Sequence, residues 1–257
     1  MDATTTPPER PRIATAGWQL PAAHRHAFPD DGSNLERYAR VFTAVEINSS
    51  FYRPHQRRTY ERWAASVPPG FRFAVKLPQA ISHERAFVGC MDLLDVFLEQ
   101  CRGLGDRLGP LLIQTPGKQD FARGAMSRFL AGLRRRHAGD VVCEPRNATW
   151  FAADAQRVLV DHRVARVAAD PARVPAAGEP GGWDGLAYWR LHGSPQMYVS
   201  PYAAAYLAAL ARRLRARDGA SWCVFDNTMW GHATANALAL QRRCRRRARR
   251  TAAPTGG

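Results

Sequence analysis

Short apolar runs alternate with helix-like segments along nearly the whole chain, and this alternation constrains the fold more than any other feature. Alternation of this kind is typical of a parallel sheet whose strands are joined by crossover helices. About 250 residues is the usual size of a (β/α)8 barrel, and this chain has 257. The sequence therefore predicts an α/β protein with a TIM-type (β/α)8 barrel in a single domain. The eight expected strands cover residues 12–18, 42–52, 71–76, 111–114, 141–146, 165–170, 186–193 and 222–227.

An open, doubly wound sheet is the main alternative, since it also alternates strands and helices. Such a fold is expected to carry a glycine-rich phosphate-binding turn after its first strand. Here the first strand ends in Gly17-Trp18, which lacks that pattern. We expect the barrel to occupy residues 12–240. A disordered leader, 1–11, is expected before it and a disordered Arg-rich tail, 241–257, after it.

Residues that start helices mark several of the connecting segments. Ser33 or Asn34 is expected to cap a helix over residues 35–41, because these side chains accept hydrogen bonds from free backbone N–H groups. Ser200 followed by Pro201 predicts a helix that starts there, since Pro is favoured at the first helical position. In contrast, the connection 171–185 is expected to be the least structured part of the interior.

The chain is strongly basic, with a formal net charge of +15. Clustered basic residues bind phosphates without sequence specificity, so a nucleic-acid-binding or nucleic-acid-processing protein is one alternative. The excess is partly local, because seven Arg residues lie between Arg242 and Arg250. A solvated helix end or a basic tail is the simpler interpretation of that run.

The composition also indicates where the protein works. No apolar run approaches the roughly 18 residues that cross a bilayer. Residues 1–11 include Asp2 and Glu9 and no apolar core, unlike a secretory signal. The five cysteines are an odd number without a C-x-x-C pair, which fits a reducing compartment. We therefore expect a soluble, cytoplasmic protein without a membrane partner.

Polar side chains occur where the expected strands end. Val45 and Ile47 share one face of their strand, whereas Glu46 and Asn48 share the other. Active sites of parallel barrels lie at the C-terminal ends of the strands, and burying an unpaired charge is costly. We therefore expect a shared polar cavity at this rim. Its side chains are those of Glu46, Asn48, Lys76, Gln114, Glu144, Arg146, Arg190, His192 and Asp226.

Lys76 is informative because Lys76 and Lys118 are the only lysines in a chain rich in Arg. A lysine at a strand end indicates a need for a point charge or a titratable amine. The alternative is an ion-pair network that merely closes the barrel mouth, with Glu46 and Glu144 neutralised by the cations nearby. Such networks contribute little to stability, because desolvation offsets the attraction, and this favours a functional role.

Six motifs follow one another between Arg12 and Leu240. They are Glu46-Ile47-Asn48-Ser49-Ser50-Phe51-Tyr52, Phe71-Arg72-Phe73 through Lys76, Gln114-Thr115-Pro116, Glu144-Pro145-Arg146 with Trp150, Arg190-Leu191-His192-Gly193 and Asp226-Asn227-Thr228. Together they resemble the motifs of the domain of unknown function 72, or YecE-like, family. The resemblance implies a TIM-type barrel and implies no reaction. The chain departs from the family pattern at Pro145, where a larger apolar residue is expected, and at Asp226, where Asn is common.

The polar side chains expected at the rim of the barrel indicate an enzyme that acts on a small anionic or polyhydroxylated ligand. Such a ligand would be phosphorylated or sugar-like. Glu46 and Glu144 are candidate general acid and base. Lys76 is a candidate electrophile or Schiff-base amine, and His192 a proton shuttle. Arg146 and Arg190 suit a phosphate or carboxylate, because guanidinium binds both in bidentate geometry. The candidate ligand-binding residues are Asn48, Tyr52, Gln114, Arg146, Trp150, Arg190, Asp226 and Asn227.

Three alternatives remain open. A metal-dependent enzyme would use Glu46, Glu144, His192 and Asp226 as ligands for a divalent ion, but the neighbouring cations repel a metal and we expect no metal site. A nucleic-acid-binding protein would use the Arg-rich tail, with an affinity that falls steeply with salt. A non-catalytic ligand sensor would bind at the same rim. The sequence indicates no particular cofactor.

Overall fold

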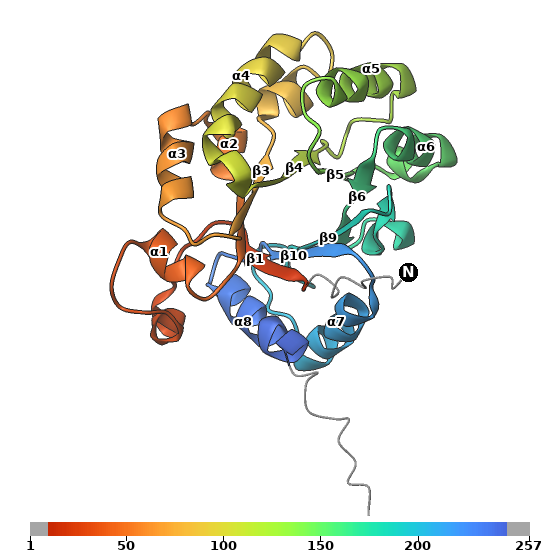
Figure 1. Ribbon diagram of the computed structural model, residues 1–257. Helices are drawn as coiled ribbons and strands as arrows, with labels where there is room; N and C mark the ends of the chain where they lie inside the picture. The colour runs from red at the N-terminus through yellow and green to blue at the C-terminus, as the bar shows by residue number, and fades with distance from the viewer. Residues whose placement is uncertain (1–9, 246–257) are drawn as a thin grey trace, which may run out of the picture.

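The computed structural model describes residues 10–245, and its parallel strands form a ring surrounded by helices (Figure 1). Hydrogen bonds define two sheets, with strand orders β1-β10-β9-β7 and β2-β3-β4-β5-β6-β8. The parallel strands are β1 (Arg12–Thr15), β2 (Ala44–Ile47), β3 (Arg72–Lys76), β4 (Leu108–Gln114), β5 (Val141–Glu144), β6 (Val164–Arg166), β7 (Ala168–Asp170), β9 (Leu186–Leu191) and β10 (Ala220–Phe225).

Two seams join these sheets into a closed barrel. At the first, Ala16 forms a single parallel bridge with Glu46, and the N–H of Gly17 donates to the carbonyl of Glu46 at 2.8 Å. At the second, β6 and β7 are consecutive pieces of one strand, separated only by Val167. β6 pairs with β5 and β7 pairs with β9, so the predicted sixth strand is continuous in space but changes partner. The predicted TIM-type (β/α)8 barrel is thereby confirmed.

The helices cover the outside of this ring (Figure 1). No helix within residues 10–245 is both long and apolar enough to span a membrane. The α-helices are α1 (Asn34–Ala39), α2 (Ser49–Tyr52), α3 (Arg57–Ala65), α4 (Met91–Cys101), α5 (Arg123–Arg134), α6 (Ala153–Asp161), α7 (Ala204–Ala216) and α8 (His232–Arg245). The other helical turns are η1 (Ala22–Ala27), η2 (Ala80–Glu84), η3 (Arg102–Arg107), η4 (Ala148–Phe151) and η5 (Pro175–Gly178).

Several boundaries differ from those expected. Ser33 caps α1 in a capping box with Glu36, as predicted, but the strand expected over 42–52 ends at Ile47 and the chain turns into α2. The helix expected at Ser200 starts only at Ala204. The backbone N–H of Tyr202 instead donates to the side chain of Asn236 on α8, at 3.1 Å, which ties this segment to another helix.

The ends of the domain and its longest connection also differ. α8 continues through Arg245, so residues 241–245, assigned to a disordered tail from the sequence, are helical. Residues 1–9 of the predicted leader and 246–257 of the predicted tail lie outside the described residues. The connection 171–185 contains η5 and the short strand β8 (Gly181–Gly182), which pairs antiparallel with β6. It is therefore more ordered than predicted.

The ring of strands separates two apolar clusters. The outer cluster lies between strands and helices and includes Val45, Phe73 and Cys143. The inner cluster fills the barrel axis with Ala14, Ala44, Ala74, Leu112, Val142, Ala165, Val167, Leu186, Tyr188, Trp222 and Val224. Side chains alternate along a strand, so the next inward positions after Ala44 and Ala74 are Glu46 and Lys76.

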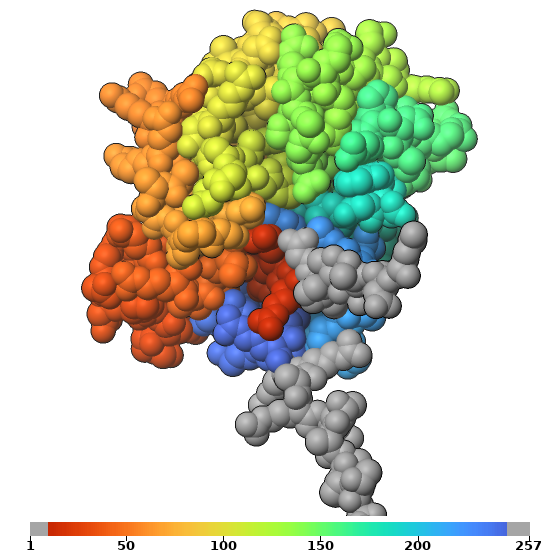
Figure 2. All heavy atoms as spheres, in the orientation of Figure 1, coloured from red at the N-terminus to blue at the C-terminus, as the bar shows by residue number. Residues whose placement is uncertain are grey.

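The space-filling view shows the first described residues, in red, near the centre of one face (Figure 2).

Candidate functional site

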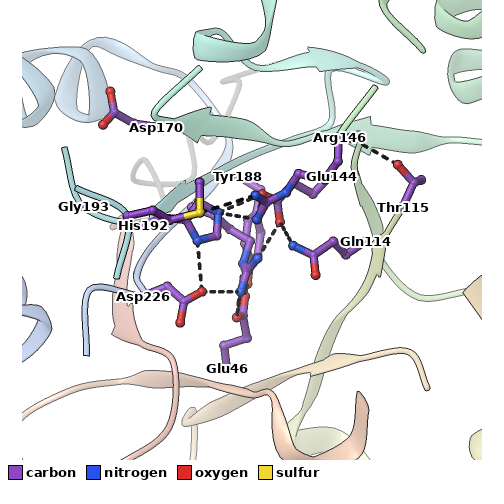
Figure 3. A network of polar contacts seen from close by, with 12 residues as sticks. Glu46, Gln114, Thr115, Glu144, Arg146, Asp170, Tyr188, His192, Gly193 and Asp226 are labelled. Carbon is purple, nitrogen blue, oxygen red and sulfur yellow. Dashed lines mark hydrogen bonds and ion pairs between the residues drawn. The ribbon is translucent and has the colours of Figure 1, made fainter. Parts of the chain in front are cut away.

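A layer of polar side chains lies on top of the inner apolar cluster, at the C-terminal ends of the strands (Figure 3). Glu46 comes from β2, Glu144 from β5 and Arg190 from β9, while His192 and Asp226 directly follow β9 and β10. All five are at most 9% exposed. The structure therefore brings together, in one buried cluster, charges that lie far apart in the sequence.

Arg190 is at the centre of this cluster. Its Nη2 lies 2.7 Å from Oε1 of Glu46, its Nε 3.1 Å from Oε2 of the same carboxylate, and its Nη1 2.5 Å from Oε2 of Glu144. Nη2 also reaches Oδ2 of Asp226 at 3.2 Å. Arg190, predicted as a clamp for an anionic ligand, is held here by three carboxylates of the protein itself.

Tyr188 completes the surroundings of Glu46. Its hydroxyl donates to Oε2 of Glu46 at 2.8 Å. Burial, together with the charge of Glu46, raises the pKa of Tyr188 well above 10, so the phenol stays protonated and remains a donor. Sequence analysis did not propose Tyr188 as a site residue. The alternation of β9, which places Tyr188 on the face of Arg190 and His192, was the signal that could have identified it.

His192 lies between two carboxylates and a guanidinium. Its Nδ1 is 3.0 Å from Oδ2 of Asp226, and its Nε2 is 2.8 Å from Oε1 of Glu144. Nη2 of Arg146 lies 3.0 Å from Nε2 of His192 and 2.8 Å from Oε1 of Glu144. A doubly protonated ring donates to both carboxylates, whereas a neutral ring protonated at Nδ1 accepts from Arg146 at Nε2. Both ring nitrogens are therefore engaged within the cluster.

Glu144 and Asp226 are ionised carboxylates of the cluster. Burial alone raises the pKa of Glu144, but the charges of Arg190 and Arg146 outweigh it and hold that pKa well below 4.5. For Asp226, the charge of Arg190 and the hydrogen bond from His192 likewise outweigh burial and lower the pKa below 3.8. Gln114 adds a donor to Glu144, with its Nε2 at 3.2 Å from Oε2. The cluster is thus a tightly paired network of charges.

Lys76 differs from its neighbours because no carboxylate within residues 10–245 lies within ion-pair distance of its amine. The side chain is 7% exposed, and Nζ lies 3.9 Å from the centre of the Phe51 ring. Burial, reinforced by the positive charge of Arg190, lowers the pKa of Lys76 from 10.5 to about 8. Lys76 is therefore a largely buried lysine whose amine packs on an aromatic ring and forms no ion pair with a described carboxylate.

Two further groups near the rim have unused hydrogen-bonding capacity. Within residues 10–245, Nε of Arg146 is buried and has no partner, and its Nη1 reaches only the sulfur of Met197, at 4.0 Å. Oδ1 of Asn48 is also buried without a donor. Buried polar groups are usually satisfied, so these two atoms are exceptions among the residues that the structure describes.

Three predicted ligand-binding residues do not join the site. Trp150 packs in the outer core against Phe87 and Phe121, and its Nε1 donates to a carbonyl at 3.0 Å. Its predicted ligand contact is wrong, because η4 turns the ring away from the barrel axis. The Nδ2 group of Asn227 donates to the carbonyl of Ser200 and to Asn236, a structural role. Tyr52 is 74% exposed and has no contact with the charged network within the described residues.

The acidic cluster does not form a metal site. Among the residues that the structure describes, no three or more His, Cys, Asp or Glu side chains are placed to hold a metal ion. The carboxylate oxygens of Glu46 and Glu144 point to arginine and histidine nitrogens instead. The donor set consequently gives the metal-dependent alternative no support.

The family model described as "Protein of unknown function DUF72" matches residues 12–256. This chain belongs to the DUF72 family. The resemblance drawn from the six motifs is thus confirmed. The UPF0759 protein YecE of Escherichia coli (strain K12) is 37% identical over 84 residues, which cover 33% of this chain and 31% of YecE. The chain therefore spans about a third of the length of that curated relative.

Solved structures agree with the family fold. A DUF72 family protein from Thermotoga maritima MSB8 superposes with a TM-score of 0.74 at 23% identity, covering 91% of this chain and 98% of that one. A xylose isomerase domain containing protein from Salmonella typhimurium LT2 superposes with a TM-score of 0.52 at 12% identity, covering 93% and 97%. At these identities the likeness shows the barrel fold that DUF72 shares with other proteins.

Proposed function

We propose that this DUF72 protein is an enzyme that acts on a small anionic, polyhydroxylated carbonyl compound, and that Lys76 forms a Schiff base with its carbonyl carbon. The observation that carries the proposal is the environment of Lys76, an almost buried amine without a carboxylate partner. A pKa of about 8 leaves far more neutral amine near pH 7 than an ordinary lysine has. The neutral amine is the nucleophile in this chemistry.

The unused donors of Arg146 support an anionic ligand. Its side chain is 11% exposed and already held by Glu144 at 2.8 Å, so the guanidinium is oriented before the ligand arrives. Its Nε has no partner among the described residues and its Nη1 reaches only the sulfur of Met197, so each leaves a charged donor for an oxygen of an anionic ligand. Oδ1 of Asn48 is an acceptor for a ligand hydroxyl. An acid group and hydroxyl groups on one small molecule would satisfy all of these atoms.

The proposed step balances with His192 as the proton donor. The lone pair of neutral Lys76 attacks the carbonyl carbon, His192 gives a proton to the carbonyl oxygen, and the attacking nitrogen gives a proton back to His192, which leaves a neutral carbinolamine. His192 then protonates the hydroxyl, which departs as water, and the nitrogen returns its second proton to His192 to give the neutral imine. His192 is the proposed source of the proton because its two hydrogen-bonding arrangements differ by one proton. Arg190, Glu46 and Tyr188 hold the network in place.

Borohydride trapping tests the proposal, because reduction of an imine leaves a permanent mass on the lysine. The protein is incubated with carbonyl-bearing sugar acids and sugar phosphates, reduced, digested and analysed by mass spectrometry. We expect an adduct at Lys76 and none at the exposed Lys118, which is the only other lysine. Lys76→Met should abolish the adduct, while Lys118→Met should leave it unchanged.

A second variant tests the anion contact. Arg146→Met should raise the ligand concentration for half-maximal trapping about tenfold, since a charged hydrogen bond contributes roughly 1.5–3 kcal/mol. Adducts spread equally over both lysines would contradict the proposal. A ligand that raises the midpoint of thermal unfolding, without trapping or turnover, would identify a non-catalytic ligand sensor instead.

A further inference from the structure

A surface groove of about 670 Å³ lies where α3 begins, outside the polar cluster. It is lined by Arg53, Pro54, His55, Gln56, Arg58, Thr59 and Arg62. The three arginines are exposed. No acidic side chain within residues 10–245 is within ion-pair distance of any of them. We call this surface the arginine groove.

The pairing of charges on α3 is uneven. Arg57 is neutralised, because its Nε lies 2.9 Å from Glu61 and its Nη1 lies 2.6 Å from Glu99. Arg58 and Arg62, in contrast, are four residues apart, on the same face of the helix, and repel each other. The helix therefore carries an uncompensated positive face that an anionic partner would stabilise.

One exposed aromatic ring directly precedes the arginine groove in the chain, and a second lies in another loop at the same end of the barrel. Tyr52, which directly precedes Arg53, is 74% exposed. Trp230, in the loop that follows β10, is 70% exposed. In a parallel barrel the loops after β2 and β10 leave the same end of the ring. Basic grooves combined with rings on which bases stack are typical of surfaces that bind single-stranded nucleic acid.

We propose that the arginine groove binds the phosphate backbone of a single-stranded nucleic acid, with a base stacked on Tyr52. The three unpaired arginines match the phosphates of such a strand, and the exposed ring matches the face of a base. This surface is separate from Lys76, so the inference holds whether or not Lys76 forms a Schiff base. Nucleic-acid binding at this surface would use arginines that contribute to the net charge of +15 and that lie outside the small-ligand site.

Fluorescence anisotropy of a labelled single strand of about 12 nucleotides tests the inference with the full chain. The groove variant is Arg53→Ser/Arg58→Ser/Arg62→Ser. The matched control is Arg123→Ser/Arg128→Ser/Arg135→Ser, which removes the same charge from exposed positions in and next to α5. The groove variant should raise the Kd at least tenfold, and the control less than about threefold. Loss of three phosphate contacts should also reduce the slope of log K against log salt by about two.

Two single substitutions separate the possible outcomes. Tyr52→Ala should raise the Kd about tenfold through lost stacking, and Lys76→Met should leave it unchanged. Equal weakening by the groove and control variants would overturn the proposal in favour of general charge attraction. Equal affinity for polyglutamate, together with no effect of Tyr52→Ala, would overturn it in favour of an acidic protein partner. Unchanged binding by the groove variant would place the contact elsewhere.

Discussion

Arg190 and Glu46 form a buried, bidentate ion pair across the barrel, although 144 positions separate them in the chain. They come from β9 and β2, which are separated in the ring by β10 and β1. Closure of the barrel is therefore what allows them to meet. Because both side chains are almost completely buried, loss of one partner leaves the other charge without compensation.

Arg190→Met should lower the free energy of unfolding by about 3–5 kcal/mol, the usual cost of breaking a buried pair from one side. Urea unfolding measures this. The double variant Arg190→Met/Glu46→Gln should recover part of the loss, because it removes one of the stranded charges. A loss below about 1 kcal/mol in the single variant would mean that the pair behaves like an exposed one.

Tyr188→Phe removes the hydroxyl that donates to Glu46 at 2.8 Å. We expect the free energy of unfolding to fall by about 1–3 kcal/mol, since a buried carboxylate loses a donor. Tyr52→Phe is the matched control, because that ring is 74% exposed and water replaces its hydroxyl contacts. Equal effects of the two substitutions on urea unfolding would contradict the role assigned to Tyr188.

Lys76 should make stability depend on pH in the alkaline range. Below its folded pKa of about 8, the folded protein bears the cost of a buried charged amine. Between about 8 and 10.5 the folded amine loses its proton while the unfolded amine keeps it, so this contribution to stability rises with pH.

Lys76→Met should therefore stabilise the protein near neutral pH by up to about 3 kcal/mol, because one pKa unit corresponds to about 1.4 kcal/mol. The advantage should shrink as the pH rises toward 10.5. Thermal unfolding across this range measures it, with Lys118→Met as the control. A destabilised Lys76→Met variant at neutral pH would show that the amine is compensated by contacts with the cluster.

Glu144 should contribute to loss of stability in acid. Its folded pKa is held below the usual 4.5, so the stabilisation is complete above that value and is lost as the pH falls through the folded pKa. Glu144→Gln should be less stable than the wild type near neutral pH, and its urea midpoint should change less between neutral and acidic pH. Parallel pH profiles for the two proteins would rule out Glu144 as a source of the acid sensitivity.

Residues whose position follows from a regular strand were predictable. The two-residue period of β2, β5 and β9 places Glu46, Glu144 and Arg190 on the inner face, and the structure finds them there. The position of Trp150 was not predictable in this way. Trp150 lies in the helical turn η4, which follows β5 and ends the two-residue alternation of side chains. The end of β2 at Ile47 and the delayed start of α7 likewise depend on contacts with other elements.

The sequence by itself determined the barrel and the inward face of strands such as β2, β5 and β9, because these follow from local alternation. Only the tertiary structure decided how the charges pair. Arg190 became a structural cation because the closed ring surrounds it with Glu46, Glu144 and Asp226. Lys76, at an equivalent strand end, was left without a carboxylate because those carboxylates already bind Arg190. That competition for a few buried partners depends on distances across the barrel, which no local pattern contains.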